Sequence, residues 1–154
     1  MAFDQVTDMD MKYMREALAL ARFSAKKDEV PVGAIIVKDG EIIGSSANMR
    51  ERNADATAHA EVEAIREACH RLGRWRLSDC EMYVTLEPCP MCAGAIVNAR
   101  LKRVVIGAKD ARGGAFGSIM DLRSYPLYHK PEIVCGVLED ECRAVLVDFF
   151  KDKR

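Results

Sequence analysis

The segment TAHAEVEAI places a histidine, His59, and a glutamate, Glu61, two residues apart at the start of an amphipathic pattern. On a helix, residues two apart are separated by roughly 200° of rotation and do not face each other. An ion pair between them, or a metal site on the side of the helix, therefore explains the spacing poorly. The spacing is explained if both side chains reach a partner that lies over the beginning of the helix.

A second pair of reactive side chains, Cys89 and Cys92, lies in the sequence EPCPMC. With this spacing they share one face of a helix, and Pro88 is suited to the first turn, where a missing N–H is no loss. The free N–H groups and the dipole of a helix N-terminus favour anions and so lower the pKa of a thiol placed there. Zinc binds thiolates, so the pair is a candidate for two zinc ligands.

The two pairs combine into one site if their helix starts face each other across adjacent strands. His59 then adds a nitrogen ligand to the two sulfurs, and the fourth position stays open, as in a catalytic zinc site. Glu61 could transfer protons there without binding the metal. Two alternatives remain: a structural zinc completed by another cysteine, His70 or His129, and a redox CxxC pair.

Length and composition limit the class of protein. A chain of 154 residues that is 49% apolar is expected to form a single domain, residues 1–154, with a core of its own. The acid-rich start MAFDQVTDMDMKYM has no apolar core of a signal peptide, and no segment approaches the roughly 20 apolar residues that span a bilayer. We therefore expect a cytoplasmic protein with no membrane association. The net charge of −1 means that any nucleic-acid binding must be local.

Six cysteines could suggest a disulfide framework, but CPMC contains the only close pair in a chain that reads as cytosolic. The other four lie in apolar contexts, where cysteine is most often a small buried hydrophobe; they are Cys69, Cys80, Cys135 and Cys142.

The elements that must position these residues alternate along the chain. Asp8 is the predicted N-cap of a first helix whose core side is Met11, Met14, Leu18 and Ala21. The dipeptide Asp39-Gly40 joins two β-rich runs and predicts a hairpin, because a type I′ turn needs φ > 0 at both central positions. The helix that holds His59 is expected to bury Val62, Ile65, Ala68 and Leu72.

The second half of the chain continues this alternation. It predicts a strand at EMYVTL, a short helix in residues 87–100, a strand at RVVIGA, a loop over 109–130 with a helical turn at SIMDL, a strand at EIVCGVL and a helix over 139–151. At least one of Phe149 and Phe150 is expected on the buried side of that last helix, in the core of the protein. The order predicts an α/β fold, a three-layer α/β/α domain with a mixed five-stranded sheet.

The motifs H-x-E and P-C-x-x-C together form the signature of zinc deaminases. The segments DEVPVGAIIVKDG, TAHAEV, YVTLEPCPMCAGAI, RVVIGAKDA and DECRAVLVDFF resemble the tRNA adenosine deaminase family of the cytidine deaminase-like superfamily, over nearly the whole chain. The zinc motif alone fits any member of the superfamily. The segments GAKDARGGAFGS and FF followed by basic residues point to the tRNA branch.

The resemblance implies one Zn2+ per chain, held by His59, Cys89 and Cys92, with Glu61 as the catalytic proton carrier. It implies a homodimer that hydrolyses adenosine to inosine at the wobble position of tRNA anticodons. The alternatives are a deaminase of a free base or nucleoside, of guanine or cytosine type, and a non-catalytic structural-zinc or RNA-binding module.

The resemblance also implies substrate-binding residues. Asn48 lies where the family holds the target base, and Asp110 lies where it contacts the anticodon loop; alone, Asn48 is typical of a turn after a strand and Asp110 of a surface aspartate. Phe149 and Lys151 belong to an aromatic and basic C-terminus suited to stacking and phosphate contact with an anticodon stem-loop.

Overall fold

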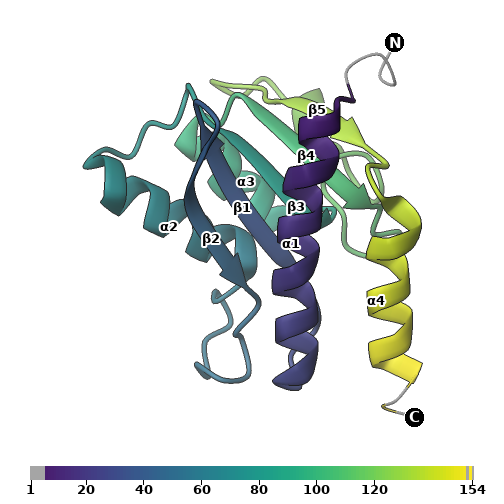
Figure 1. Cartoon of the computed structure of the whole chain (residues 1–154). Coiled ribbons are helices and arrows are strands. Elements are labelled where there is room, and N and C mark those ends of the chain that lie inside the picture. Colours follow the sequence, from purple (N-terminus) through teal and green to yellow (C-terminus); the bar gives the residue numbers. More distant parts are fainter. Residues whose placement is uncertain (1–5, 152, 154) are drawn as a thin grey trace.

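The computed structural model describes residues 6–151 and 153 (Figure 1). Its five-stranded sheet has the order β2-β1-β3-β4-β5. The strands are β1 (Gly33–Lys38), β2 (Glu41–Ala47), β3 (Glu81–Leu86), β4 (Arg103–Ala108) and β5 (Glu132–Cys135). Strand β1 is antiparallel to β2 and β3, whereas β3, β4 and β5 run parallel, so the predicted mixed sheet is confirmed.

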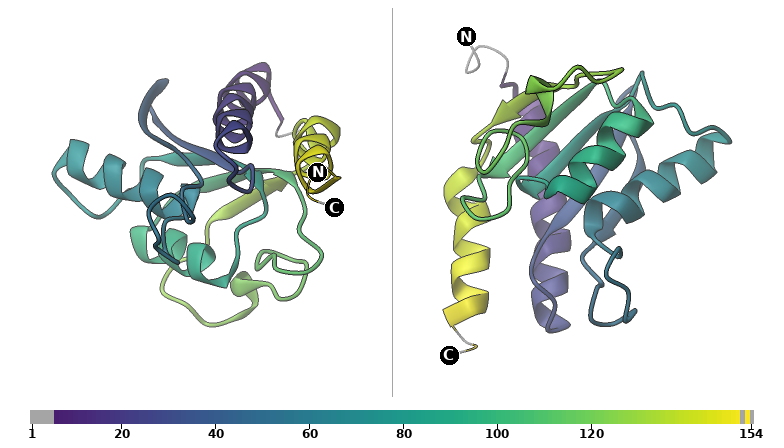
Figure 2. Two further views of the ribbon diagram at one scale, coloured as in Figure 1. Left: turned by 90° about the horizontal axis from the view of Figure 1, so that it is seen from below. Right: turned by 180° about the vertical axis from the view of Figure 1, so that it is seen from behind.

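Four α-helices cover the two faces of this sheet (Figure 2). They are α1 (Asp8–Lys26), α2 (Ala60–Leu72), α3 (Pro90–Ala99) and α4 (Glu139–Lys151). Alternate strand residues point to opposite faces, so Ile36 packs with α2 and α3 while its neighbour Ile35 packs with α1. The three-layer α/β/α prediction is confirmed, with one hydrophobic cluster on each face of the sheet. No helix in the described part of the chain is long and apolar enough to span a bilayer.

Helix α1 begins one residue earlier than the sequence suggested, because Thr7 and not Asp8 is its N-cap. The Thr7 side chain accepts a hydrogen bond from the Asp10 backbone N–H, and the Asp10 carboxylate accepts one from the Thr7 N–H, which forms a capping box. The predicted core side of the helix is correct, since Met14 and Leu18 are buried.

Asp10 also joins α1 to the sheet. Its two carboxylate oxygens accept hydrogen bonds from Arg103 of β4 at 2.9 and 2.8 Å, and from the Tyr83 hydroxyl of β3 at 2.8 Å. Burial alone would raise the pKa of Asp10, but these hydrogen bonds outweigh it and hold the pKa below its ordinary value.

The turn between β1 and β2 has the predicted geometry. Asp39 and Gly40 both adopt positive φ, 50° and 78°, as a type I′ turn requires. The hairpin is followed by the loop that leads to α2.

The prediction for the inner face of α2 is correct for Ala68, which is buried, and for Ile65 and Leu72, which pack against the core cluster, but it is wrong for Val62. Ala60, Ala64 and Ala68 are buried, whereas Val62 is only partly buried and lies outside the core cluster. The reason is a close approach to β2: a Cβ at Gly44 would lie 2.4 Å from the Ala64 carbonyl oxygen. Only small side chains fit between this helix and the strand.

The long loop after β4 is present, but the helical turn predicted at SIMDL is wrong. Phe116 and Asp121 form an isolated bridge instead, and the short 3-10 helix η2 (Leu122–Ser124) follows it. Strand β5 ends at Cys135, before the predicted end, because Gly136 adopts a φ of 88°.

The last helix, α4, spans the predicted residues but is less buried than expected. Cys142 is its buried residue, while Phe149 is half-buried and Phe150 is 49% exposed, so neither phenylalanine is in the core. The cysteines of the chain are free thiols; Cys80 and Cys142 are buried as predicted, whereas Cys69 and Cys135 are only partly so.

Candidate metal and catalytic site

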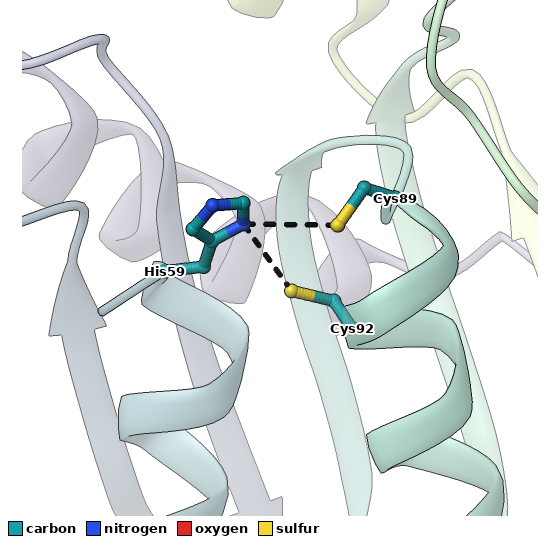
Figure 3. A group of neighbouring side chains, drawn as sticks. All are labelled: His59, Cys89 and Cys92. Atoms are coloured by element: carbon teal, nitrogen blue, oxygen red, sulfur yellow. Dashed lines mark hydrogen bonds between the residues drawn. The ribbon is translucent and has the colours of Figure 1, made fainter. Parts of the chain in front are cut away.

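The starts of α2 and α3 lie side by side (Figure 3). His59 is the N-cap of α2 and Cys89 is the N-cap of α3, and neither side chain caps its own helix. Both are therefore free to point at a shared partner. Pro90, not Pro88 as the sequence suggested, occupies the first helical position of α3, and Cys92 lies two residues further into the first turn.

The three side chains converge on one point (Figure 3). His59 Nδ1 lies 3.7 Å from Cys89 Sγ and 3.5 Å from Cys92 Sγ, and all three atoms are within 4.8 Å of one another. No other cluster of three such side chains with metal-ligand spacing occurs among residues 6–151 and 153.

This spacing matches the requirements of zinc. Zn–N bonds of about 2.1 Å and Zn–S bonds of about 2.3 Å at a tetrahedral angle separate nitrogen from sulfur by roughly 3.6 Å. The measured 3.7 and 3.5 Å agree with this value. One nitrogen and two sulfurs are also a donor set that zinc prefers, so the residues present fit the ion and leave one position for another ligand.

The surroundings of the two thiols shift their pKa values in opposite directions. A hydrogen bond from the Cys92 thiol, together with the nearby His59, lowers the pKa of Cys89 to about 5. The same hydrogen bond and burial raise the pKa of Cys92. The pair therefore holds one thiolate at neutral pH, which favours capture of a cation.

Glu61 follows the histidine by two residues and lies beside the ligand cluster without belonging to it. Its side chain is buried, and burial raises the pKa of Glu61 to about 7, with the nearby Cys89 adding to the rise. A carboxyl group with this pKa can both accept and donate a proton near neutral pH, as a general acid and base must.

These side chains open into a pocket of about 120 Å³, which also takes in Asn48, Arg50 and Asp110. The pocket thus contains two of the residues predicted to bind substrate. Two wider depressions adjoin it. One, of about 700 Å³, shares Asn48 and Arg50 with the pocket, and the other, of about 480 Å³, shares Asp110.

Asn48 and Asp110 each also stabilise a loop. The Asn48 amide donates to the Val30 carbonyl at 3.1 Å and accepts from the Arg50 N–H at 3.3 Å, so the turn role and a place in the pocket coexist. The Asp110 carboxylate accepts from the N–H groups of Arg112 and Gly113, each at 3.1 Å.

The C-terminal candidates lie farther from the ligand cluster. Phe149 lines the 700 Å³ depression together with Lys153, another basic residue of the C-terminus. Lys151 is exposed and lines a separate hollow beside Phe150, so the structure does not bring it to the pocket.

The sequence analysis missed two buried carboxylates: Glu87, which lines the pocket itself, and Glu29, which lines the depression on the Asn48 side. Glu87 comes directly after the apolar strand EMYVTL, and an acidic residue at the end of a buried strand was a usable signal. Glu29, in the sequence KKDEV, has acidic and basic neighbours and carries no such signal.

Comparison with known proteins gives a consistent result. The family model of the MafB19-like deaminases matches residues 9–154. The tRNA-specific adenosine deaminase of Bacillus subtilis (strain 168) is 49% identical over 146 residues, which cover 94% of this chain and 91% of the relative. That of Agrobacterium fabrum is 46% identical over 92% of this chain and 94% of the relative.

A solved structure supports the same grouping. It comes from biochemical and structural studies of A-to-I editing by tRNA:A34 deaminases at the wobble position of transfer RNA. It superposes on this chain with a TM-score of 0.85 and 44% identity, over 88% of this chain and 99% of the other.

Proposed function

Because this chain belongs to the MafB19-like deaminase family and to the tRNA-specific adenosine deaminases, we propose that it hydrolyses adenosine to inosine at the wobble position of tRNA anticodons. The observation that carries the proposal is the convergence of His59, Cys89 and Cys92 beside the buried carboxyl group of Glu61. Residues 1–154 act as one zinc-dependent deaminase domain, with one zinc ion per chain.

The site residues divide into ligands and a proton carrier. Zinc, held by His59, Cys89 and Cys92, supplies the Lewis acidity that makes water a nucleophile near neutral pH. Glu61 takes a proton from the water that attacks C6 of adenine. Glu61 gives this proton to N1 of the purine, then takes the second proton from the hydroxyl now bonded to C6 and gives it to the amino group, which leaves as ammonia while the C6–O bond becomes a carbonyl. The same residue therefore prepares the nucleophile and activates the ring. The raised pKa of Glu61, about 7, suits both steps.

The shape around the pocket favours RNA over a free nucleoside. A pocket for one small molecule encloses its ligand, whereas an RNA enzyme must leave room for the chain on both sides of the target base. Here the small pocket opens into two depressions, one on the Asn48 side and one on the Asp110 side. Asn48 holds the target base, and Asp110 meets a neighbouring nucleotide of the anticodon loop.

Basic and aromatic side chains surround these depressions. Lys109, Arg112 and Arg143 line the one on the Asp110 side, together with Phe150. Phe149 and Lys153 line the other. Rings that stack on bases and cations that meet phosphates are the usual means of binding single-stranded RNA. Lys151, on the exposed side of α4, meets phosphate farther from the pocket.

A homodimer in the cytoplasm completes the proposal. Large apolar side chains are exposed on and near α2 and α3: Met91 by 38%, Trp75 by 56% and Ile119 by 52%. A second copy of the chain would cover them. Free thiols throughout the chain agree with a reducing compartment, where tRNA is also found.

The decisive experiment offers the purified protein an anticodon stem-loop with a wobble adenosine, alongside free adenosine, guanine and cytosine. Inosine in the RNA and released ammonia are measured. We expect the protein to deaminate the stem-loop and none of the three small molecules. Efficient turnover of a free base or nucleoside, with none of the stem-loop, would replace the proposal with a small-molecule deaminase. No turnover by zinc-loaded protein would support a non-catalytic module.

A further inference from the structure

The two walls of the pocket are irregular loops, and the backbone of each loop donates hydrogen bonds to one buried carboxylate. The first wall follows β2 and contains Asn48 and Arg50, and the second follows β4 and contains Asp110. Glu29 holds the first and Glu87 the second, with exposed fractions of only 2% and 3%. Neither carboxylate has a role in the proposed proton transfer.

Glu87 directs both of its oxygens to the second loop. Oε1 accepts from the Asp110 N–H at 3.1 Å and from the Ser118 hydroxyl at 2.5 Å. Oε2 accepts from the N–H groups of Phe116 and Ser118 at 3.0 and 3.2 Å. Gly114 packs so closely that an added Cβ would lie 2.2 Å from the carboxyl carbon. The loop is therefore wrapped around this one side chain.

The same attachment links the loop to the metal site. Glu87 and Pro88 directly precede Cys89, and the Pro88 carbonyl accepts a hydrogen bond from the Ala115 N–H at 2.8 Å. The position of Asp110 relative to the ligand Cys89 is thus fixed by two neighbouring residues of one segment.

Glu29 performs the corresponding role on the other side. Its Oε1 accepts from the Glu51 N–H at 3.0 Å, and its Oε2 accepts from the Arg52 N–H at 2.6 Å. Asn48, which lies just before these two residues, donates to the Val30 carbonyl in the connection between α1 and β1, and its own carbonyl accepts from the hydroxyl of Ser24 in α1 at 3.0 Å.

We propose that Glu29 and Glu87 are positioning residues that fix the two walls of the pocket and thereby set the affinity for RNA on either side of the target adenosine. This inference rests on the proposed function. A carboxylate is suited to the task because it only accepts hydrogen bonds and can accept several. Glutamine has the same shape but replaces one acceptor with a donor, which faces the N–H groups of the loop and leaves some of them unpaired.

The test compares Glu87→Gln and Glu29→Gln with the unchanged protein. For an anticodon stem-loop with a wobble adenosine, KM should rise about 10-fold in each variant, because misplaced contacts lose binding, while kcat changes by less than about threefold. Zinc content should stay the same. Amide hydrogen exchange should quicken in residues 110–118 for Glu87→Gln and in residues 49–53 for Glu29→Gln, each loop responding to its own carboxylate.

Two further variants separate positioning from general stability. Ser118→Ala removes one donor to Glu87 without disturbing the carboxylate, so KM should rise in the same direction but less. Glu132→Gln, at an exposed position on β5, makes the same chemical change and should leave KM unaltered. If Glu87→Gln does not fold, Ser118→Ala and Glu29→Gln decide the question.

The inference is wrong if the unchanged protein deaminates the stem-loop and the variants lower only the melting temperature, with KM within about twofold of the original. It is also wrong if exchange quickens uniformly over the chain. If the unchanged protein does not deaminate the stem-loop, the proposed function fails, and local exchange still shows whether each carboxylate holds its loop.

Discussion

His59 Nδ1 and Cys92 Sγ lie 3.5 Å apart, although 33 positions separate them along the chain. The contact exists because α2 and α3 begin side by side. The N-cap residues of these helices, His59 and Cys89, make no capping hydrogen bond with their side chains. Two thiols and an imidazole this close form a group that could hold a metal ion.

Zinc should therefore depend on these ligands and not on the other cysteines. Cys89→Ser removes a soft ligand, so we expect zinc content to fall from about one ion per chain to near zero by metal analysis. Cys142→Ser is the matched control, because Cys142 is buried against the opposite face of the sheet. Equal loss of zinc in a folded Cys142→Ser variant would contradict the ligand assignment.

Replacing Glu61 should separate catalysis from metal binding. Glu61→Gln keeps the shape of the side chain but cannot accept and return a proton. Turnover should fall by at least about 10²-fold while zinc content and melting temperature stay near their original values. The measurement is single-turnover formation of inosine. Activity within a few-fold of the unchanged protein would exclude Glu61 as the proton carrier.

The buried pair of Asp10 and Arg103 should make stability depend on pH. Its hydrogen bonds hold the pKa of Asp10 below the ordinary value, so the pair stabilises the fold above the unfolded-state pKa and loses this contribution as pH falls through the lower, folded-state pKa. Asp10→Asn should cost about 3 kcal/mol at pH 7, because it takes the nearer carboxylate away from the buried Arg103 and leaves it with the more distant Glu81, at 3.6 Å.

Denaturant unfolding at several pH values checks this. The difference between Asp10→Asn and the unchanged protein should shrink below about pH 4, the range in which an unfolded aspartate takes up its proton. Glu41→Gln, which removes the exposed partner of Arg71, is the control and should cost less than about 1 kcal/mol at any pH. A pH-independent cost of Asp10→Asn would contradict the explanation.

Gly44 should tolerate no side chain. An added methyl group would meet the Ala64 carbonyl of α2 at 2.4 Å, so Gly44→Ala must push the helix outward. We expect a loss of about 1–3 kcal/mol in unfolding free energy, typical of overpacking. Zinc affinity should fall with it, since α2 carries His59. Gly94→Ala is the matched control, because an added Cβ at Gly94 meets nothing within 4 Å.

Removing the C-terminal residues should weaken RNA binding and leave zinc binding unchanged. Ending the chain after Phe149 removes Phe150 and the basic residues that follow it. We expect activity on the stem-loop to fall about 10-fold, the effect of losing one stacked base, with zinc content unchanged. Titration of RNA binding against salt gives a second readout, because each lost phosphate contact flattens the dependence. An unchanged salt dependence would show that this end of the chain meets no phosphate.

The sequence predicted those parts of the molecule that depend on local chemistry. The turn at Asp39-Gly40 follows from two residues that accept positive φ. The convergence of His59, Cys89 and Cys92 follows from donor type and spacing, because N-cap and first-turn positions are the parts of a helix that point beyond its end. The order of strands and helices follows from hydrophobic periodicity.

What the sequence did not predict depends on distant partners. Both Thr7 and Asp8 are good capping residues, and the capping box with Asp10 decides between them. Val62 is more apolar than Ala64, yet the approach of Gly44 reserves the inner position for the smaller residue. The position of Glu87 after a buried strand indicates a buried carboxylate, but its four donors belong to a loop 23 to 31 residues further along the chain, which the local sequence does not reveal.

The pairing of β1 has a consequence for the kinetics of folding. Strand β1 pairs with β2 across a two-residue turn. Its pairing with β3, in which Ala34 lies opposite Val84, joins strands that are separated in the chain by β2, by the loop that follows it and by α2 with its N-cap His59. Hairpins close in about 1–10 μs, whereas distant pairings wait for slower chain closure. His59 precedes β3 in the chain and Cys89 follows it, so we expect their contact to form in the late steps of folding. Zinc should then slow unfolding and leave the rate of folding unchanged.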